Sequence, residues 1–325
     1  MKFPAVRFCL LFSVLGLLAS AQEAAPVRKP GEYPLTADSL PQEGVPKGQL
    51  HGPFEWRSSI IRGTVRRYWV FVPAQYKADT PAGLFVFHDG QRALNPGGPL
   101  RVDRVMENLT HKKDIPVMIG LFITPGNLSH HYPDNLGMSN PNNRAQEYDV
   151  LSDSYSRMII EELIPELKKT YNISDDIEKR VIGGTSSGAI CAFTTAWERP
   201  DAFRKVISMI GSYVSIGYQP ARGNQPMIPG GDLYPTLIRR NPPKNIRIFL
   251  QDGSNDLDNP FGNWFLANQQ MLAAFNFANT SADRRKLEGP RYDVKHEWGD
   301  GQHNDSHGGA LLPDILRWMF RDTEK

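Results

Sequence analysis

The chain has 325 residues and a hydrophobic content of 40%, which suits one large globular domain or two small ones. It carries 37 basic and 35 acidic residues, and the two counts become equal without Lys2 and Arg7 near the amino terminus. A chain with balanced charge and no basic cluster is not expected to bind nucleic acid.

Residues 1–21 have the pattern of a signal peptide. A positive start is followed by the apolar run 8–18 and then by small residues at 19–21. The run is shorter than the ~20 residues that span a bilayer. We therefore expect cleavage, a secreted or periplasmic protein, and no membrane association afterwards. Cleavage removes Cys9 and leaves Cys191 alone, so no intramolecular disulfide is expected.

Residues 22–50 are rich in proline and show little apolar periodicity, so we expect an extended leader that lies on the domain or is free in solvent. Residues 51–325 are expected to form one domain. β-branched and aromatic runs predict its strands, in chain order 66–72, 84–87, 117–123, 180–182, 206–210, 246–250 and 292–296. Helical patterns separate several of them at 154–171, where Pro165 predicts a kink, and at 189–197, 262–277 and 312–320.

Strands that alternate with helices predict an α/β fold in which helices cover both faces of a mostly parallel sheet. The runs at 84–87 and 117–123 are apolar on successive residues, as buried parallel strands are. Residues 124–151 are polar and rich in Asn and Pro, and a segment of this length is expected to be functional or disordered. Arg144 and Glu147 within it are tentative substrate contacts. The alternative is a surface loop held by an Arg144–Glu147 ion pair.

The stretch Gly184-Thr185-Ser186-Ser187-Gly188 fits the Gly-x-Ser-x-Gly pattern with Ser186 at its centre. In that pattern a tight turn between a strand and a helix exposes a strained serine hydroxyl, and small neighbours leave room for it. The stretch follows an expected strand and opens an expected helix, which is the required setting. The alternative is a glycine-rich turn that only packs the helix onto the sheet.

A serine nucleophile needs a histidine base and a carboxylate that orients the base, in the chain order serine, acid, histidine. His303 is the candidate base because it lies in a loop after the last strand, with His307 in reserve. Asp256 is the leading acid after the 246–250 strand, Asp258 is second, and Asp252 is expected to cap the turn. The spacing of His303 and His307 predicts no metal site, since no helix or third ligand accompanies it.

Backbone donors are needed for the negative charge that develops on the substrate oxygen. The N–H of Ser187 is one candidate. The second is expected after the 84–87 strand, from Gln91 or Gly90, in a stretch that also reads as a simple tight turn. Trp264, at the start of the 262–277 helix, is a further tentative substrate contact.

Six stretches resemble, in chain order, the esterase family that includes enterochelin esterases, feruloyl esterases and the acetyl-xylan esterases of carbohydrate esterase family 1. They are FHDG, RAQEY, EELIPELKKTYNISDD, VIGGTSSGAICAF, FLQDGSNDLDN and GDGQHNDSHGGALLPDILRWMF. The resemblance covers about residue 45 to the end. It implies an α/β-hydrolase fold and hydrolysis of carboxylic esters without a cofactor. The family's Gly-x-x-Asp motif matches Gly253 to Asp256, and its Gly-x-His motif matches His303.

We therefore expect an exported serine esterase in which Ser186 attacks the ester, His303 transfers the proton and Asp256 orients His303. Feruloyl or acetyl esters of plant polysaccharide are favoured, because a chain of zero net charge suits a neutral substrate better than an anionic ferric siderophore. Arg92 or Arg144 would be the local cations for the latter. The alternatives are a siderophore trilactone esterase, an acyltransferase, which the superfamily also contains, and a non-catalytic binding protein on the same fold. The sequence leaves the oligomeric state open.

Overall fold

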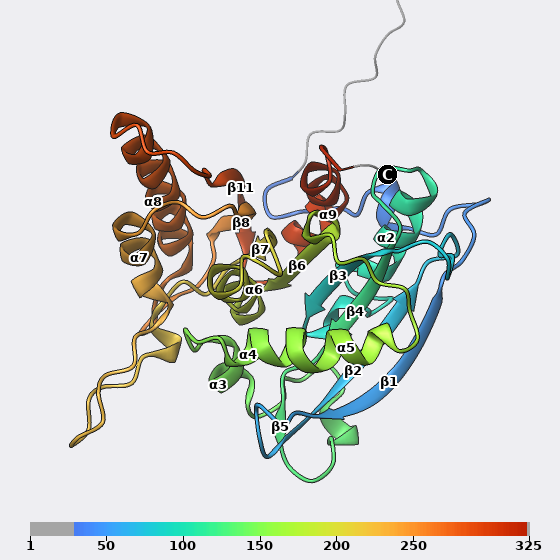
Figure 1. Cartoon of the computed structure of the whole chain (residues 1–325), viewed down its shortest axis with the longest axis horizontal. Helices are drawn as coiled ribbons and strands as arrows, with labels where there is room; N and C mark the ends of the chain where they lie inside the picture. The colour runs from blue at the N-terminus through green and yellow to red at the C-terminus, as the bar shows by residue number, and fades with distance from the viewer. Residues whose placement is uncertain (1–28, 324–325) are drawn as a thin grey trace, which may run out of the picture.

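The computed structural model describes residues 29–323, so the expected signal peptide (1–21) and the first residues of the expected leader lie outside the described residues. A mixed sheet runs through the molecule (Figure 1). Its strands lie in the order β1 (Gln49–Arg57), β2 (Thr64–Val72), β4 (Met118–Ile123), β3 (Gly83–His88), β6 (Arg180–Thr185), β7 (Lys205–Met209), β8 (Arg247–Asn255) and β11 (Asp293–Gln302). From β4 to β11 neighbouring strands are parallel, whereas β1, β2 and the short β5 (Asn127–Leu128) pair antiparallel.

Helices cover both faces of this sheet (Figure 1). One face packs against α1 (Gly90–Ala93), α2 (Val102–His111) and α9 (Ser306–Met319). The other face packs against α4 (Ser154–Arg157), α5 (Ile164–Lys168), α6 (Ser187–Glu198), α7 (Tyr234–Arg240) and α8 (Trp264–Arg284). The described residues also form α3 (Arg144–Tyr148) and the hairpin of β9 (Asp258–Asn259) and β10 (Gly262–Asn263), together with short 3₁₀-helical turns at Ala37–Ser39, Asp134–Leu136, Ile177–Lys179, Ser215–Gly217 and Gly231–Leu233. The predicted α/β-hydrolase type of fold, with a mostly parallel sheet, is confirmed.

Burial explains which strands the sequence revealed. Every residue of β3, β4 and β6 is buried, and apart from His88, Arg180 and Thr185 at their ends these strands consist of apolar residues and glycine. Every residue of the edge strand β1 is exposed or half-buried, its sequence mixes polar and apolar residues without a continuous apolar run, and it was not predicted. Its one neighbour is β2.

The helix expected at 154–171 is interrupted. After α4 the chain forms the π-helical turn η3 (Met158–Leu163) and then α5, which has Pro165 in its first turn. Proline supplies no backbone N–H, and a π turn is one of the ways in which a helix accommodates the lost hydrogen bond. The predicted kink is thus a change of helix type that begins before Pro165.

The described part of the expected leader lies on the domain. The Asn108 side chain on α2 donates hydrogen bonds to the backbone oxygens of Asp38 and Leu40, at 2.8 and 2.9 Å. Arg317 on α9 pairs with the Asp38 carboxylate at 2.6 Å. These contacts fix residues 38–40 against the face that carries α2 and α9.

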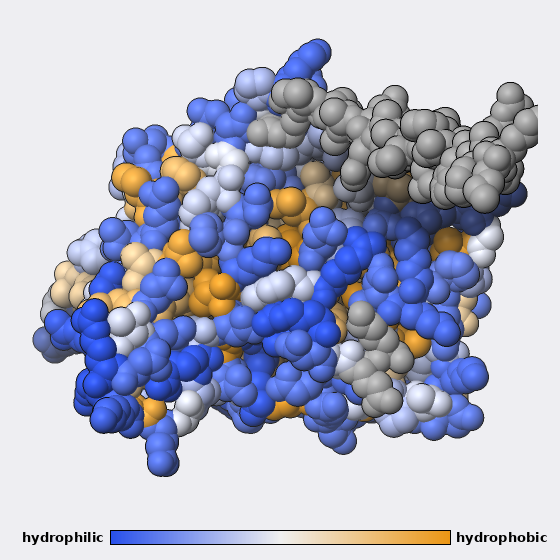
Figure 2. Space-filling model, turned by 90° about the horizontal axis from the view of Figure 1, so that it is seen from above, coloured by the Kyte–Doolittle hydropathy of each residue, from blue (hydrophilic) through white to orange (hydrophobic). Residues whose placement is uncertain are grey.

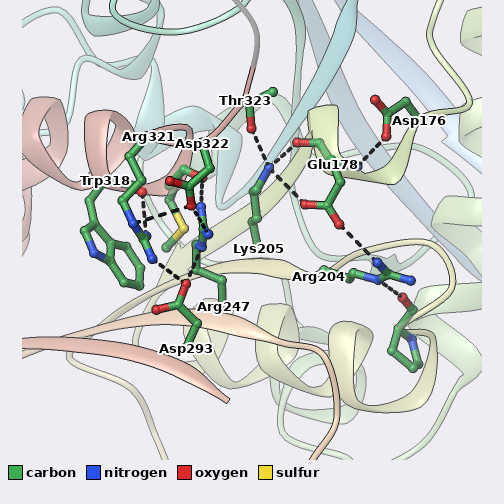
Figure 3. A network of polar contacts seen from close by, with 12 residues as sticks. Asp176, Glu178, Arg204, Lys205, Arg247, Asp293, Trp318, Arg321, Asp322 and Thr323 are labelled. Carbon is green, nitrogen blue, oxygen red and sulfur yellow. Dashed lines mark hydrogen bonds and ion pairs between the residues drawn. The ribbon is translucent and has the colours of Figure 1, made fainter. Parts of the chain in front are cut away.

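Charged side chains form a network at the amino ends of β7, β8 and β11 (Figure 3). Arg247 pairs with Asp293 and with Asp322, both at 2.6 Å. The buried Lys205 donates to the Glu178 backbone oxygen and, at 3.0 Å, to the Thr323 hydroxyl. The network therefore ties the end of the described chain to the sheet, away from the carboxyl ends of the same strands.

The face seen in Figure 2 is mostly hydrophilic, and its hydrophobic residues form small patches between polar ones, as on most globular domains. Within residues 29–323 no helix is both long enough and apolar enough to cross a membrane.

Candidate active site

Ser186 occupies a strained turn between β6 and α6. Its backbone has φ 57° and ψ −123°, a left-handed conformation that residues with a side chain rarely adopt. Its N–H donates to the Met209 oxygen at 2.9 Å, which ties the turn to the neighbouring strand β7. Ser186 is half-buried, whereas its neighbours Thr185 and Ser187 are buried.

The glycines on either side of Ser186 are needed for close approach. A Cβ atom on Gly184 would lie 2.6 Å from the backbone carbon of Gly188, so any side chain there would force the turn apart. A Cβ atom on Gly188 would come within 3.1 Å of His88. The Gly-x-Ser-x-Gly spacing thus has a steric cause in this fold.

Strand register brings Asp256 and His303 together. Parallel strands β8 and β11 pair Asn255 with Gln302, and Asp256 and His303 each follow by one residue. Asp256 and His303 therefore follow their strands at the same level of the carboxyl edge of the sheet, the edge at which Ser186 follows β6, and β7 lies between β6 and β8.

These three side chains form a hydrogen-bonded chain. His303 Nε2 lies 2.9 Å from Ser186 Oγ, and His303 Nδ1 lies 2.5 Å from Asp256 Oδ1. Asp256 Oδ1 also accepts the Leu257 N–H at 2.5 Å. The Asp256 side chain is fully buried, whereas that of His303 is 21% exposed. This is the geometry of a nucleophile, a base and a group that orients the base.

Asp256 is held in its charged form. Burial alone would raise its pKa, but hydrogen bonds from His303 and Asp252, together with the charge of His303, outweigh burial and lower the pKa of Asp256. A carboxylate that accepts the Nδ1–H of His303 leaves Nε2 with a free lone pair directed at Ser186.

The alternative residues from the sequence lie elsewhere. Asp258 is exposed in β9. Asp252 is buried and caps its own turn by accepting the Gly253 N–H at 2.7 Å, as expected, and it also lies beside Asp256. His307 is buried in α9, where Nδ1 lies 2.8 Å from the Gln251 side chain and the ring stacks on Tyr33. Neither Asp258 nor His307 joins the chain from Ser186 to Asp256.

Ser212 and Trp264 pack against the reacting pair. Ser212 Oγ lies 3.1 Å from Ser186 Oγ and accepts the Trp264 indole N–H at 3.0 Å. The Trp264 ring meets the His303 ring edge-on at 5.5 Å between centroids. Trp264 is 2% exposed, so the structure shows it supporting His303 and Ser212.

The candidate oxyanion donors lie on two adjoining helix starts. Ser187 is the first residue of α6, and Gly90 and Gln91 open α1, positions where backbone N–H groups have no partner within the helix. The buried His88 joins the two starts, because its Nδ1 donates to the Gly188 oxygen at 2.7 Å. Burial lowers the pKa of His88 to about 4, so this ring is neutral. Both polar atoms of the Gln91 side chain are buried without a partner among the described residues.

The two tentative contacts on α3 have different partners. Arg144 pairs with Asp89 through hydrogen bonds of 3.0 and 2.7 Å, next to the oxyanion loop. Glu147 is buried and pairs with Arg66 at 2.6 Å. The alternative of an Arg144–Glu147 pair is thus wrong, and the Glu147 carboxylate is used inside the fold, where a substrate would have to displace Arg66.

A second buried acid lies beside Ser187. Asp149 is 1% exposed, and the Ser187 hydroxyl, Arg144 and Asp89 are nearby. Burial raises the pKa of Asp149 to about 7, against the lowering effects of Ser187 and Arg144.

A cavity of about 790 Å³ opens between α3 and the 216–228 segment. Its wall contains Val150, next to Asp149 in the chain, and Gly217, which lies against the Asp149 backbone oxygen. Its lining does not include Ser186, His303 or Asp256, and its connection to the nucleophile turn runs through Asp149. Across residues 29–323 no group of three or more His, Cys, Asp or Glu side chains is arranged to hold a metal ion.

Sequence reasoning missed the residues that support the turn. Ser212 contacts Ser186, His88 contacts Gly188 and Asp89 contacts Arg144. In each pair the two residues are far apart in the sequence. His88 and Asp89 directly follow the expected strand 84–87. That position was used to predict oxyanion donors at Gly90 and Gln91, and no role was predicted for His88 or Asp89. Ser212 follows β7 in the same way, and no motif marks it.

Comparisons with known proteins agree with this architecture. A family model described as "Putative esterase" matches residues 59–312. The iron(III) enterobactin esterase of Escherichia coli strain K12 is 26% identical over 170 residues, which are 52% of this chain and 37% of that protein. The corresponding esterase of Escherichia coli O6:H1 is 26% identical over 168 residues, which are 52% of this chain and 36% of that protein. The matched region is thus little more than a third of these curated relatives.

Solved structures share the fold at low identity. The enterobactin esterase of Shigella flexneri superposes with a TM-score of 0.62 and 21% identity, covering 89% of this chain and 63% of that one. A CE1 ferulic acid esterase from the anaerobic fungus Anaeromyces mucronatus gives 0.57 and 16%, covering 88% and 97%. Because the family model spans most of the chain, as the sequence motifs indicated, this chain belongs to the family described as putative esterases.

Proposed function

We propose that this protein is a serine carboxylic ester hydrolase that uses Ser186, His303 and Asp256. The observation that carries the proposal is the unbroken hydrogen-bonded chain from the strained Ser186 hydroxyl through His303 to the buried Asp256. Membership of an esterase family supports the same activity.

The geometry supports the following steps. His303 Nε2, 2.9 Å from Ser186 Oγ, takes the hydroxyl proton as the oxygen attacks the ester carbonyl. The same nitrogen then protonates the departing alcohol, which leaves an acyl group on Ser186. Water, activated by His303, attacks this acyl-enzyme and releases the acid. Asp256 stays ionised throughout and stabilises the imidazolium.

The oxyanion is bound by backbone donors in this proposal. Ser187 N–H is one donor, and Gly90 or Gln91 supplies the second. The hydrogen bond from His88 to Gly188 keeps the α1 and α6 starts together. Such preorganised donors typically contribute ~3 to 4 kcal/mol each to the rate.

A neutral ester, feruloyl or acetyl on a polysaccharide, fits the charges around the site. Arg144 is paired with Asp89, and Arg92 is paired with Asp305 at 2.7 Å. Neither arginine that was considered for an anionic siderophore is therefore free to bind one. We place the distal part of the substrate in the cavity between α3 and residues 216–228.

A catecholate siderophore lactone is the second candidate substrate. The sequence likeness to iron(III) enterobactin esterases favours it, and Arg222 in the cavity wall would be its cation. We also propose that residues 1–21 direct export of the protein. The assays should therefore use a preparation that lacks these residues.

The experiment compares hydrolysis of p-nitrophenyl acetate by the wild type and by Ser186→Ala. Loss of the nucleophile is expected to lower kcat by about 10⁴-fold or more. Ser281→Ala, a serine-to-alanine change within helix α8, serves as the matched control and should retain wild-type turnover. Equal rates for wild type and Ser186→Ala would instead indicate a binding protein, and acyl transfer to an added alcohol in preference to water would indicate a transferase.

The same preparation is then given methyl ferulate, acetylated xylan and a catecholate lactone under identical conditions. The neutral esters are expected to give the higher kcat/KM. A higher value for the lactone would reverse the order of the two substrate proposals and leave the triad proposal intact.

A further inference from the structure

Two buried carboxyl groups face each other behind His303. Asp252, on β8, has no exposed surface, and the Asp256 side chain has none either. The Asp256 N–H donates to the Gly253 oxygen at 3.0 Å, so the turn that follows Asp252 brings the two carboxyl groups close together, and each affects the pKa of the other. Ionised carboxylates only accept hydrogen bonds, so this contact requires a proton on one of them.

The surrounding donors are divided between the two acids. Asp256 Oδ1 accepts from His303 Nδ1 and from the Leu257 N–H. Asp256 Oδ2 is buried and has no N–H donor among the described residues. Asp252 accepts from the Gly253 N–H and, at 2.7 Å, from the Asn268 amide on α8. A proton carried by Asp252 would supply the hydrogen bond that Asp256 Oδ2 lacks.

Asn268 fixes the orientation of Asp252. Its side-chain N–H₂ group faces three oxygens, of Gly211 at 2.9 Å, Asp252 at 2.7 Å and Trp264 at 3.1 Å. Asp252 is therefore held between the loop after β7, helix α8 and Asp256.

We propose that Asp252 is a positioning residue whose protonated carboxyl donates a hydrogen bond to Asp256 and thereby fixes the orientation of Asp256 toward His303. The proposal rests on the triad proposed above. Among the described residues the hydrogen bonds of Asp252 go to Gly253 and Asn268 and not to Ser186 or His303, so we expect Asp252 to act on the rate through Asp256.

The electrostatics agree with this assignment of the proton. Burial, followed by the hydrogen bond and negative charge of Asp256, raises the pKa of Asp252 to about 9, whereas Gly253 and Asn268 act in the opposite direction. The neighbour of Asp252 on β11 is the uncharged Trp298, and the contact from α8 is the neutral Asn268. At neutral pH Asp252 is thus protonated and Asp256 is ionised, as in other pairs of carboxyl groups that share one proton.

A pH profile distinguishes this role from simple packing. Above a pH of about 9 Asp252 loses its proton, and two adjacent negative charges repel each other, so kcat/KM of the wild type is expected to fall. Asp252→Asn keeps an N–H donor but cannot ionise. Its kcat/KM at pH 7 is expected to lie within about 5-fold of the wild-type value, and its alkaline decline should be absent or shifted to higher pH.

Asp252→Leu removes the donor while keeping a similar size. Its kcat at pH 7 is expected to fall by about 10- to 100-fold, because a poorly oriented triad reacts slowly, with KM little changed. Asp258→Asn, which changes an exposed acid in β9, is the matched control and should keep the wild-type profile. Rates are corrected with Ser186→Ala for spontaneous hydrolysis at high pH.

The proposal is overturned if Asp252→Leu keeps the wild-type kcat, if Asp252→Asn is as slow as Asp252→Leu, or if Asp252→Asn retains the alkaline decline. A readout that needs no turnover separates this failure from failure of the esterase proposal. Infrared difference spectra at pH 7 between wild type and Asp252→Asn should show the C=O stretch of a protonated carboxylic acid in the wild type. Its absence would overturn the proposal even if the protein hydrolyses esters.

Discussion

At the scale of single residues, the Ser186 turn depends on side chains that do not react. Ser186 has a strained backbone, Gly184 and Gly188 leave the space, and His88 joins the turn to the oxyanion loop. A strained backbone costs free energy, and in proteins such strain is concentrated at functional sites. Asp149, directly behind Ser187, is a further cost in free energy.

Asp149 should make stability depend on pH. Its pKa rises from 3.8 in the unfolded chain to about 7 in the folded protein, so between these values the folded state binds more protons. The free energy of unfolding therefore falls as pH rises through this range, and the full penalty is present above pH 7. Asp149→Asn removes the penalty and is expected to increase the free energy of unfolding at pH 8 by about 2 to 4 kcal/mol.

Urea unfolding at pH 5 and pH 8 tests this expectation. The gap between Asp149→Asn and wild type should widen from pH 5 to pH 8. Asp153→Asn, an exposed acid four residues later, should show no such widening. A gap of the same size at both pH values would mean that the Asp149 carboxyl does not titrate between them.

At the scale of elements, the fully buried ion pair between Arg66 and Glu147 anchors the long 124–151 segment. Glu147 on α3 binds Arg66 on β2, the Gly126 N–H at 3.0 Å and the Asn143 side chain at 2.9 Å. Through these bonds both ends of the segment are fixed to the sheet. A polar sequence of this length predicted function or disorder, and the structure shows that part of its polarity serves to anchor it.

Glu147→Gln should weaken the fold and leave substrate binding alone. It leaves the buried Arg66 charge without its partner, which typically costs about 3 to 5 kcal/mol. The expected result is a lower urea midpoint, with KM unchanged when kinetics are measured well below the transition. Glu161→Gln, which breaks an exposed pair with Arg157, should leave the midpoint unchanged. A raised KM with an unchanged urea midpoint would instead indicate that Glu147 contacts the substrate.

At the scale of the whole molecule, the two ends of the parallel strands have different tasks. Their carboxyl ends carry Ser186, Asp256 and His303, and the amino ends of β7, β8 and β11 carry the ion-pair network that binds the chain's last described residues (Figure 3). Ligands of open α/β sheets bind at the carboxyl ends of the strands. The network therefore stabilises the sheet without occupying the site.

Much of this arrangement is predictable from the sequence. Buried strands show as apolar runs, and Ser186 was expected directly after one of them, whereas His303 was expected in the loop after the last strand, β11, which is mostly half-buried or exposed. Ser212, His88 and the Asp252–Asp256 contact depend on which strands lie side by side, and no local pattern encodes that order. The exposed edge strand β1 escaped prediction because it buries too little surface to need an apolar pattern.

The most direct test of the central claim is to label the protein with an aryl phosphonate and locate the adduct by peptide mass spectrometry. An activated serine attacks phosphorus as it attacks an ester carbonyl, and the adduct is stable. The account predicts one phosphonyl group per chain, on Ser186, and much slower labelling of His303→Ala. Ester turnover by a protein that remains unlabelled, or that carries the label on another residue, would contradict it.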